Sequence, residues 1–97
     1  MTNYTVRVEL HDADDGDYED LHKAMSAKGF SRSLGIDGVR WKLPSAEYSM
    51  VADITPQQVL SKAQAAANKV QPEPEPSILV TGSPKVRVFS GLERINK

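Results

Sequence analysis

The sequence predicts a single α+β domain, and three segments of its 97 residues carry this prediction. Residues 3–10 alternate between apolar and polar side chains, which is typical of a half-buried strand. Residues 16–28 repeat apolar side chains at steps of three and four, which indicates an amphipathic helix. A capping box at Thr55 opens a second helix.

An acidic turn joins the first strand to the first helix. The strand, NYTVRVEL, is expected to bury one face, which carries Tyr4, Val6, Val8 and Leu10. Asp14 or Asp15 is expected to cap the helix over residues 16–28, because a carboxylate accepts hydrogen bonds from the free amides of the first turn. Gly29 ends this helix, since glycine readily adopts the left-handed C′ conformation.

The middle of the chain predicts a hairpin centred on Asp37 and Gly38. Both residues tolerate the positive φ angles that a two-residue hairpin turn requires. Residues 30–34 resemble a short strand before the turn. After the turn, residues 39–53 are predicted as one long strand, broken at Pro44 because proline cannot donate to a ladder.

The second helix has the best-defined start in the chain. Thr55 and Gln58 form the capping box, and Pro56 occupies the first helical position, which it favours. The helix is expected to run to Val70 and to bury an alanine-rich face. Residues 71–77, QPEPEPS, cannot continue it and are predicted as a flexible, extended loop.

The last part of the chain predicts one further strand over residues 77–81. Residues 86–89 alternate again and either extend that strand or add another. The tail, residues 91–97, is expected to fray.

The predicted order β-α-β-β-α-β is that of a ferredoxin-like sandwich. In this arrangement two helices cover one face of a four-stranded antiparallel sheet. Residues 1–97 are expected to form this one domain, since domains usually span about 100–200 residues.

Composition narrows the functional classes. Lys and Arg number 12 and Asp and Glu number 13, so the net charge of −1 does not draw the protein onto a polyanion. The absence of cysteine excludes disulfides, a thiolate zinc site and a cysteine nucleophile. No apolar run approaches the roughly 18 residues of a membrane span. The N-terminus also lacks the apolar segment of a signal peptide, so a cytoplasmic location is expected.

The charges are distributed unevenly along the chain. Residues 9–20 are strongly acidic, and residues 23–42 are basic apart from Asp37. An EF-hand reading from Asp12 fails, because its glycine falls one place early and its twelfth position is Lys23. A looser divalent-ion site at Asp12 stays open, but helix capping in a solvated acidic loop is the simpler interpretation. No metal or other cofactor is expected.

Two histidines are the candidates for proton transfer near neutral pH. His22 is expected on the flank of the first helix's buried stripe and is therefore partly accessible, whereas His11 lies in a loop. Metal-free RNA cleavage needs a base for the 2′-hydroxyl, an acid for the leaving oxygen and a cation for the phosphate. His22 with Arg7 or Arg32 could supply these groups, although a surface histidine without a role is the simpler interpretation.

Residues 29–48 contain three basic residues, Arg32, Arg40 and Lys42, near Trp41, the only tryptophan of the sequence. Basic side chains neutralise phosphates and aromatic rings stack on bases in proteins that bind single strands. Alternation places Trp41 on the face opposite Arg40 and Lys42, so Trp41 is expected in the core and not on an RNA surface. The aromatic pair of an RNA-recognition motif is also missing.

Four stretches, YTVRVEL, YEDLHKAM, GFSR and LPSAEYSMVADIT, together resemble the GhoS-like antitoxin family of type V toxin–antitoxin systems. The resemblance covers roughly residues 3–70. It implies a ferredoxin-like fold akin to the Cas2 proteins of CRISPR systems. It also implies a bacterial endoribonuclease that cleaves the single-stranded mRNA of its toxin, with little or no dependence on metal, and a homodimer.

The resemblance and the chemistry of the residues together suggest a site. The expected catalytic residues are His22, within YEDLHKAM, and Arg32, within GFSR. The expected RNA-binding residues are Arg7, Ser31, Arg40 and Lys42. The alternative is a non-catalytic ferredoxin-like module that binds RNA or protein and dimerises through its sheet.

Overall fold

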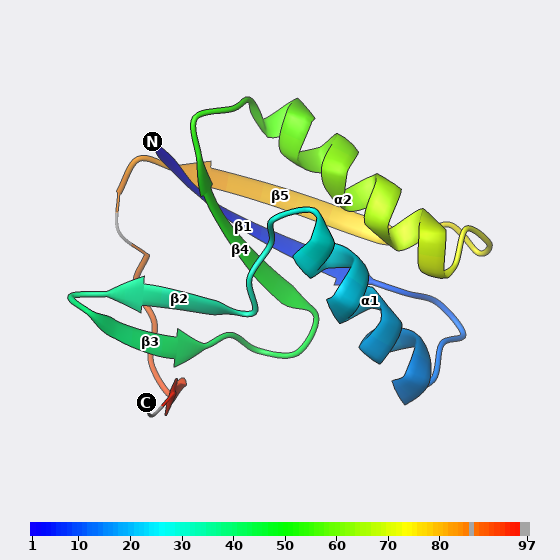
Figure 1. The fold of residues 1–97 in the computed structure, drawn as a ribbon, viewed down its shortest axis with the longest axis horizontal. Coiled ribbons are helices and arrows are strands. Elements are labelled where there is room, and N and C mark those ends of the chain that lie inside the picture. The colour runs from blue at the N-terminus through cyan, green and yellow to red at the C-terminus, as the bar shows by residue number, and fades with distance from the viewer. Residues whose placement is uncertain (86, 96–97) are drawn as a thin grey trace.

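A computed structural model of the protein describes residues 1–85 and 87–95, which form two helices and six strands. In chain order these elements are β1 (Thr2–Glu9), α1 (Asp15–Ala27), β2 (Ser33–Ile36), β3 (Val39–Lys42), β4 (Glu47–Ala52), α2 (Pro56–Val70), β5 (Ser77–Ser83) and β6 (Glu93–Ile95). Figure 1 shows both helices beside one sheet, with the β2–β3 hairpin projecting to one side. The predicted α+β class is confirmed.

The strands of the described residues form two antiparallel sheets of three strands each. The main sheet has the order β4-β1-β5, and the small sheet has the order β2-β3-β6. The prediction of one four-stranded sheet is therefore wrong. The β2–β3 hairpin, which that prediction placed within the sheet, leaves it and forms the small sheet with β6.

The two sheets separate within residues 39–53, which the sequence predicted as one strand. β3 ends at Lys42 and β4 begins at Glu47. Pro44 between them has no amide hydrogen to extend a ladder. Its carbonyl instead accepts a hydrogen bond from the amide of Glu47 at 3.2 Å, and Ala46 has a φ of 68°. This turn redirects the chain, so that the predicted strand becomes two strands in different sheets.

After α1 the chain forms one bridge with the main sheet, at Ser31. Its amide donates to the carbonyl of Ser49 at 2.8 Å, and the amide of Ser49 donates back at 2.7 Å. Two residues later, Ser33 pairs with Lys42 of β3 instead. The segment therefore begins beside the edge of β4, where a fourth strand of the main sheet would lie. It leaves this edge after one bridge and continues as β2 of the small sheet.

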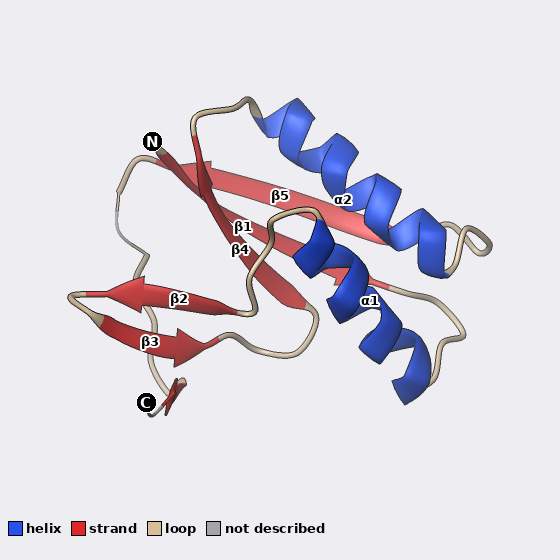
Figure 2. Cartoon of the chain, in the orientation of Figure 1, coloured by secondary structure: helices blue, strands red, loops and turns tan. Residues whose placement is uncertain are grey.

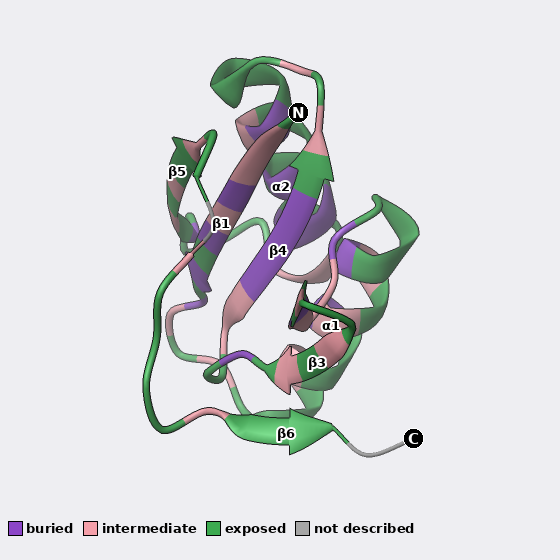
Figure 3. Ribbon diagram, turned by 90° about the vertical axis from the view of Figure 1, so that its left-hand side faces the viewer, coloured by how far each residue is buried: buried purple, intermediate pink, exposed green. Residues whose placement is uncertain are grey.

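Both helices lie on the same face of the main sheet (Figure 2). The face of β1 turned toward them is the one that period-two alternation predicted, and the four predicted side chains, Tyr4, Val6, Val8 and Leu10, are at most 5% exposed. The buried apolar core comprises Tyr4, Val6, Val8, Leu10, Leu21, Met25, Phe30, Tyr48, Met50, Val59, Ala63, Ala66 and Ala67. Figure 3 shows the opposite face of this sheet, which the helices leave open, with α2 behind it.

The predicted helix boundaries and hairpin turn are confirmed. Asp14 accepts a hydrogen bond from the amide of Asp17 at the start of α1, and Thr55 accepts one from the amide of Gln58 at the start of α2. Gly29 follows α1 with a φ of 94°. The turn residues between β2 and β3 have φ angles of 52° at Asp37 and 79° at Gly38. These features depend on local geometry alone, which is why the sequence reveals them.

The chain after β5 passes over the open face of the main sheet before it reaches β6 (Figure 3). Asn3 Nδ2 donates to the carbonyl of Lys85 at 3.0 Å. Two residues on, Arg87 Nη1 donates to the carbonyl of Tyr4 at 2.9 Å. These contacts hold the segment against β1.

The tail differs from its prediction. Residues 91–97 were expected to fray, yet residues 93–95 form β6 and pair with β3. Residues 87–89, expected in a strand, lie in neither a helix nor a strand. Residues 86, 96 and 97 lie outside the described residues.

Trp41 does not lie in the main core, where it was expected. Its side chain is partly exposed on the small sheet, and its ring centroid lies 5.2 Å from that of Phe89. Because β3 left the main sheet, Trp41 packs against the returning C-terminal segment instead of the helices.

Gly82 of β5 allows the ring of Tyr4 to lie across it, and this contact yields a stability prediction. The two residues are cross-strand partners, and a Cβ at Gly82 would lie 2.7 Å from Cε1 of Tyr4. The ring cannot easily move, because its hydroxyl donates to the carbonyl of Ile54. Gly82→Ala is therefore expected to lower the free energy of unfolding in urea by about 1–3 kcal/mol. The same change in the first turn of α1, Gly16→Ala, serves as control. A Cβ there would lie 3.3 Å from Oδ1 of Asp14, so this variant is expected to change the free energy of unfolding by less than about 1 kcal/mol.

Candidate functional site

His22 on α1 and Tyr48 on β4 are joined by a hydrogen bond between the Nδ1 atom and the phenolic oxygen, at 2.6 Å. Their ring centroids lie 5.8 Å apart. Tyr48 is fully buried, whereas His22 is partly exposed. Tyr48 therefore holds the imidazole in place, and Nε2 is the ring nitrogen left for a ligand.

Local structure explains how these two side chains meet. Leu21 and Met25 are buried on the inner face of α1, which leaves His22 on the flank of that face. On β4, Tyr48 belongs to the face that packs against the helices. The flank of the helix and the buried face of the strand thus meet at the hydroxyl of Tyr48.

Arg32 contributes a positive charge to the same place. It lies between α1 and β2 and is partly exposed. Burial and the nearby Arg32 guanidinium lower the pKa of His22, and Glu19 opposes them. His22 is therefore predominantly neutral at pH 7, because its pKa falls below the ordinary value of about 6.5. His22, Arg32 and Tyr48 are called the His22 cluster below.

Tyr48 keeps its proton throughout the physiological range. Burial raises the pKa of Tyr48 to about 12, although the charge of Arg32 acts in the opposite direction. The hydroxyl can then either accept a hydrogen bond from Nδ1–H of His22 or donate one to an unprotonated Nδ1. The first tautomer leaves Nε2 as a base, and the second makes Nε2–H a donor.

The structure also brings together Ser31 and Arg40, two of the expected RNA-binding residues. Nη2 of Arg40 donates to Oγ of Ser31 at 3.3 Å and to Oγ of Ser33 at 2.6 Å. The two serine hydroxyls lie 3.2 Å apart and therefore share one side of the segment 31–33. Arg32, between them, points to the other side, because successive side chains of an extended segment alternate.

Arg7 and Lys42, the other two expected RNA-binding residues, join neither group through a side-chain hydrogen bond within residues 1–85 and 87–95. Arg7 is exposed on the open face of the main sheet, between Glu47 and Leu79 on the neighbouring strands. Lys42 is exposed on β3, opposite Glu93 of β6. The six expected residues are thus spread over both sides of the molecule.

The acidic loop shows no metal centre in the part of the chain that the structure describes. Among those residues, no group of three potential ligands could hold a metal ion. Asp14 and Asp17 are used in capping α1. His11, the other histidine, contacts the hydroxyl of Ser77 at 2.9 Å.

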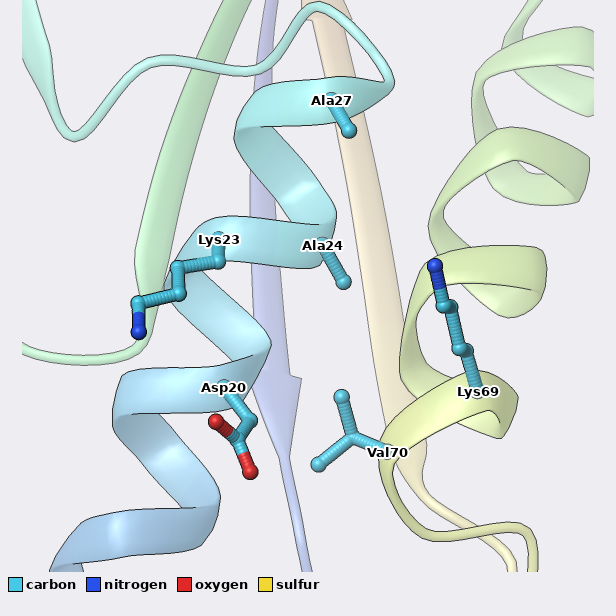
Figure 4. Close-up of a pocket in the computed structure, with 6 residues that line it drawn as sticks. All are labelled: Asp20, Lys23, Ala24, Ala27, Lys69 and Val70. Carbon is cyan, nitrogen blue, oxygen red and sulfur yellow. The ribbon is translucent and has the colours of Figure 1, made fainter.

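A groove of about 360 Å³ lies between the C-terminal halves of the two helices (Figure 4). Asp20, Lys23 and Lys69 are the charged residues that line it. In Figure 4 the two lysines point in different directions and do not converge on one point. This groove therefore carries no candidate chemistry.

Tyr48 is the member of the His22 cluster that sequence reasoning missed. It lies within residues 39–53, which were predicted as a strand, and its side chain is buried. Nothing in the sequence links it to His22, because the two residues lie 26 positions apart and belong to different elements.

Comparison with known proteins gives no match to a family model, to a curated protein or to a solved structure. No helix in residues 1–85 and 87–95 has the length and apolarity to cross a membrane.

Proposed function

We propose that this protein is an endoribonuclease antitoxin that cleaves single-stranded toxin mRNA, with His22 and Arg32 acting on the RNA. The observation that carries the proposal is the partly exposed, neutral imidazole of His22, held by Tyr48 beside the guanidinium of Arg32. The resemblance to the GhoS-like family supplies the toxin mRNA as the substrate class.

The cluster supports a cleavage step by the 2′-hydroxyl of the RNA itself. Nε2 of His22 takes the proton of the 2′-hydroxyl, and that oxygen attacks the adjacent phosphorus. The bond to the 5′-oxygen breaks, and this oxygen takes a proton from water. The products are a 2′,3′-cyclic phosphate and a 5′-hydroxyl. The guanidinium of Arg32 stabilises the charge that develops on the phosphoryl oxygens.

The pH dependence of cleavage tests this role of His22. A base must be unprotonated, so the rate should rise with pH through the pKa of His22 and level off above it. Because that pKa is lowered, the half-maximal rate is expected below pH 6.5. Labelled single-stranded RNA incubated with the protein across this range, and analysed for cyclic phosphate ends, measures the profile. If the RNA stays intact at every pH while the protein is folded, the proposed endoribonuclease activity is refuted.

The second candidate is an RNA- or protein-binding module of the same α+β fold class without catalysis. It is favoured by the hydroxyl of Tyr48, which has no described hydrogen-bond acceptor other than His22. That environment favours Tyr48 as the donor and Nε2–H as a donor to a phosphate oxygen. Protein binding or dimerisation would use the edge of β5, one of the two outer strands of the main sheet, because the edge of β4 is bridged by Ser31.

Salt dependence separates the forms of this second candidate. RNA binding without cleavage should weaken steeply as salt rises, because phosphate contacts release counterions. Association between copies through a strand edge should depend on protein concentration, persist in high salt and ignore RNA. Sedimentation at several salt concentrations, with and without RNA, distinguishes them.

A further inference from the structure

A polar hollow of about 260 Å³ lies between the open face of the main sheet and the β2–β3 hairpin. Its walls come from β1, from the segment 29–35, from β3 and β4, and from the C-terminal segment. The polar side chains among its described lining are Asn3, Ser31, Ser33, Ser49, Arg40 and Arg87, and none of the described lining residues is acidic.

Arg40 is held in this hollow by hydroxyls and a carbonyl. Its Nε and Nη2 both contact Oγ of Ser33, at 3.2 and 2.6 Å, and Nη2 also donates to the carbonyl of Ser33 at 3.2 Å. Neutral acceptors orient a guanidinium without cancelling its charge. In the hydrogen bonds of the described residues Nη1 takes no part, so its two N–H groups are left for a ligand.

Gly35 makes the position of Arg40 possible. The two residues are cross-strand partners, and a Cβ at Gly35 would lie 3.0 Å from Nη1 of Arg40. The glycine therefore leaves room for the guanidinium, which contacts Ser31 and Ser33.

Arg87 brings a second guanidinium from a distant part of the chain. Its Nη1 donates to the carbonyl of Tyr4 at 2.9 Å and contacts Oγ1 of Thr5 at 3.3 Å. Burial lowers the pKa of Arg87, which reflects its partly dry surroundings. A charge that is already partly desolvated interacts more strongly with an anion than one in open water.

We propose that this hollow binds a phosphate group between the guanidinium groups of Arg40 and Arg87, with one hydroxyl of the hydrogen-bonded pair Ser31 and Ser33 as a further donor. Arginine forks match the geometry of phosphate oxygens, and hydroxyls complete such sites. The site does not depend on the cleavage proposed above, because Ser31 and Ser33 lie on the side of their segment opposite Arg32. The phosphate can belong to a free phosphate or to a nucleic-acid backbone, which share this chemistry.

The test is a titration with inorganic phosphate, followed by the amide chemical shifts of the ¹⁵N-labelled protein. The amides of Ser31, Ser33 and Gly35 are expected to shift with saturation, whereas chloride at equal ionic strength should not move them. Arg40→Gln is expected to weaken phosphate binding about tenfold, the loss of one charge-assisted hydrogen bond. Lys62→Gln, which removes the same charge from the exposed surface of α2, should leave binding unchanged.

Two further variants test the contribution of each arginine to phosphate binding. Arg87→Gln should weaken phosphate binding similarly, and its thermal unfolding shows whether the contacts to β1 were lost instead. If it unfolds, Arg40→Lys replaces it, and this variant should keep the charge but lose most of the binding, because the fork is gone. Shifts no larger than those in chloride, or equal losses in Lys62→Gln and Arg40→Gln, would overturn the proposal.

A decathymidylate, which has no 2′-hydroxyl and so cannot be cleaved by this route, identifies the source of the phosphate. Displacement of inorganic phosphate by decathymidylate supports a backbone phosphate as the ligand. Phosphate binding that decathymidylate does not disturb supports a free phosphate. Both outcomes retain the site, and both can be obtained whether or not the protein cleaves RNA.

Discussion

Replacing His22 with alanine is expected to reduce the rate of RNA cleavage by about 10²–10⁴-fold, the usual contribution of a positioned acid or base. The variant loses the only ring in the His22 cluster that can take the proton of the 2′-hydroxyl. Because His22 is partly exposed on the flank of α1, the fold should survive, and circular dichroism would verify this. Single-turnover cleavage of labelled RNA measures the rate.

His11→Ala is the matched control, since it removes the other histidine from a loop contact with Ser77. It should cleave RNA at the rate of the unmodified protein. Equal losses in His22→Ala and His11→Ala would contradict the assignment, as would full activity in His22→Ala. Arg32→Ala should lose activity as well, because the charge beside the scissile phosphate is removed.

Tyr48 is a positioning residue in this scheme, because it is buried and acts through His22. Tyr48→Phe should shift the pH profile as well as slow the reaction. In the base tautomer the hydroxyl oxygen accepts from Nδ1–H, and it does so more strongly when the ring is charged. Its removal should then lower the pKa of His22, which NMR titration of the ring measures. A raised pKa would show that Tyr48 donates to Nδ1 and would favour the binding module.

The second large effect is on stability. Leu21→Ala is expected to lower the free energy of unfolding by about 2–5 kcal/mol, through lost burial and the cavity left behind. Leu21 is fully buried on α1, within the core shared by both helices and the main sheet. A domain of this size is stable by only about 5–15 kcal/mol, so the loss is a large share.

Leu79→Ala provides the control with the same chemical change. Leu79 on β5 is 65% exposed, so its truncation should alter stability by less than about 0.5 kcal/mol. Urea unfolding of both variants measures the difference. Similar losses in the two variants would show that the helices do not form the main core with this face of the sheet.

The elements of the fold were predictable because their signals are local. Asp14 and Thr55 cap helices through amides three residues away, and the Asp37-Gly38 turn depends on two φ angles. The buried face of β1 follows from alternation within eight residues. Such signals survive in any tertiary arrangement, so both helices, the first strand and the hairpin turn could be predicted. The separation of residues 39–53 into two strands and the strand β6 were not predicted.

The candidate site was predictable only in part. His22 and Arg32 were chosen for their chemistry, and the structure places the imidazole of His22 near the guanidinium of Arg32. Tyr48 could not be identified, because its role depends on a contact between α1 and β4. The hollow between Arg40 and Arg87 was likewise hidden, since Arg87 reaches it only through the path of the C-terminal segment over β1.

The sequence by itself determined the two helices with their caps, the hairpin turn and the buried face of the first strand. Only the tertiary structure decided which strands pair. Pro44 and the turn at Ala46 direct β3 away from β4, and the C-terminal segment then supplies β6 to β3. Strand pairing joins segments that lie far apart along the chain, and its outcome depends on competing partners and packing surfaces. The local sequence does not indicate the outcome of that competition. It does indicate the dihedral angles and the periodicity of each element.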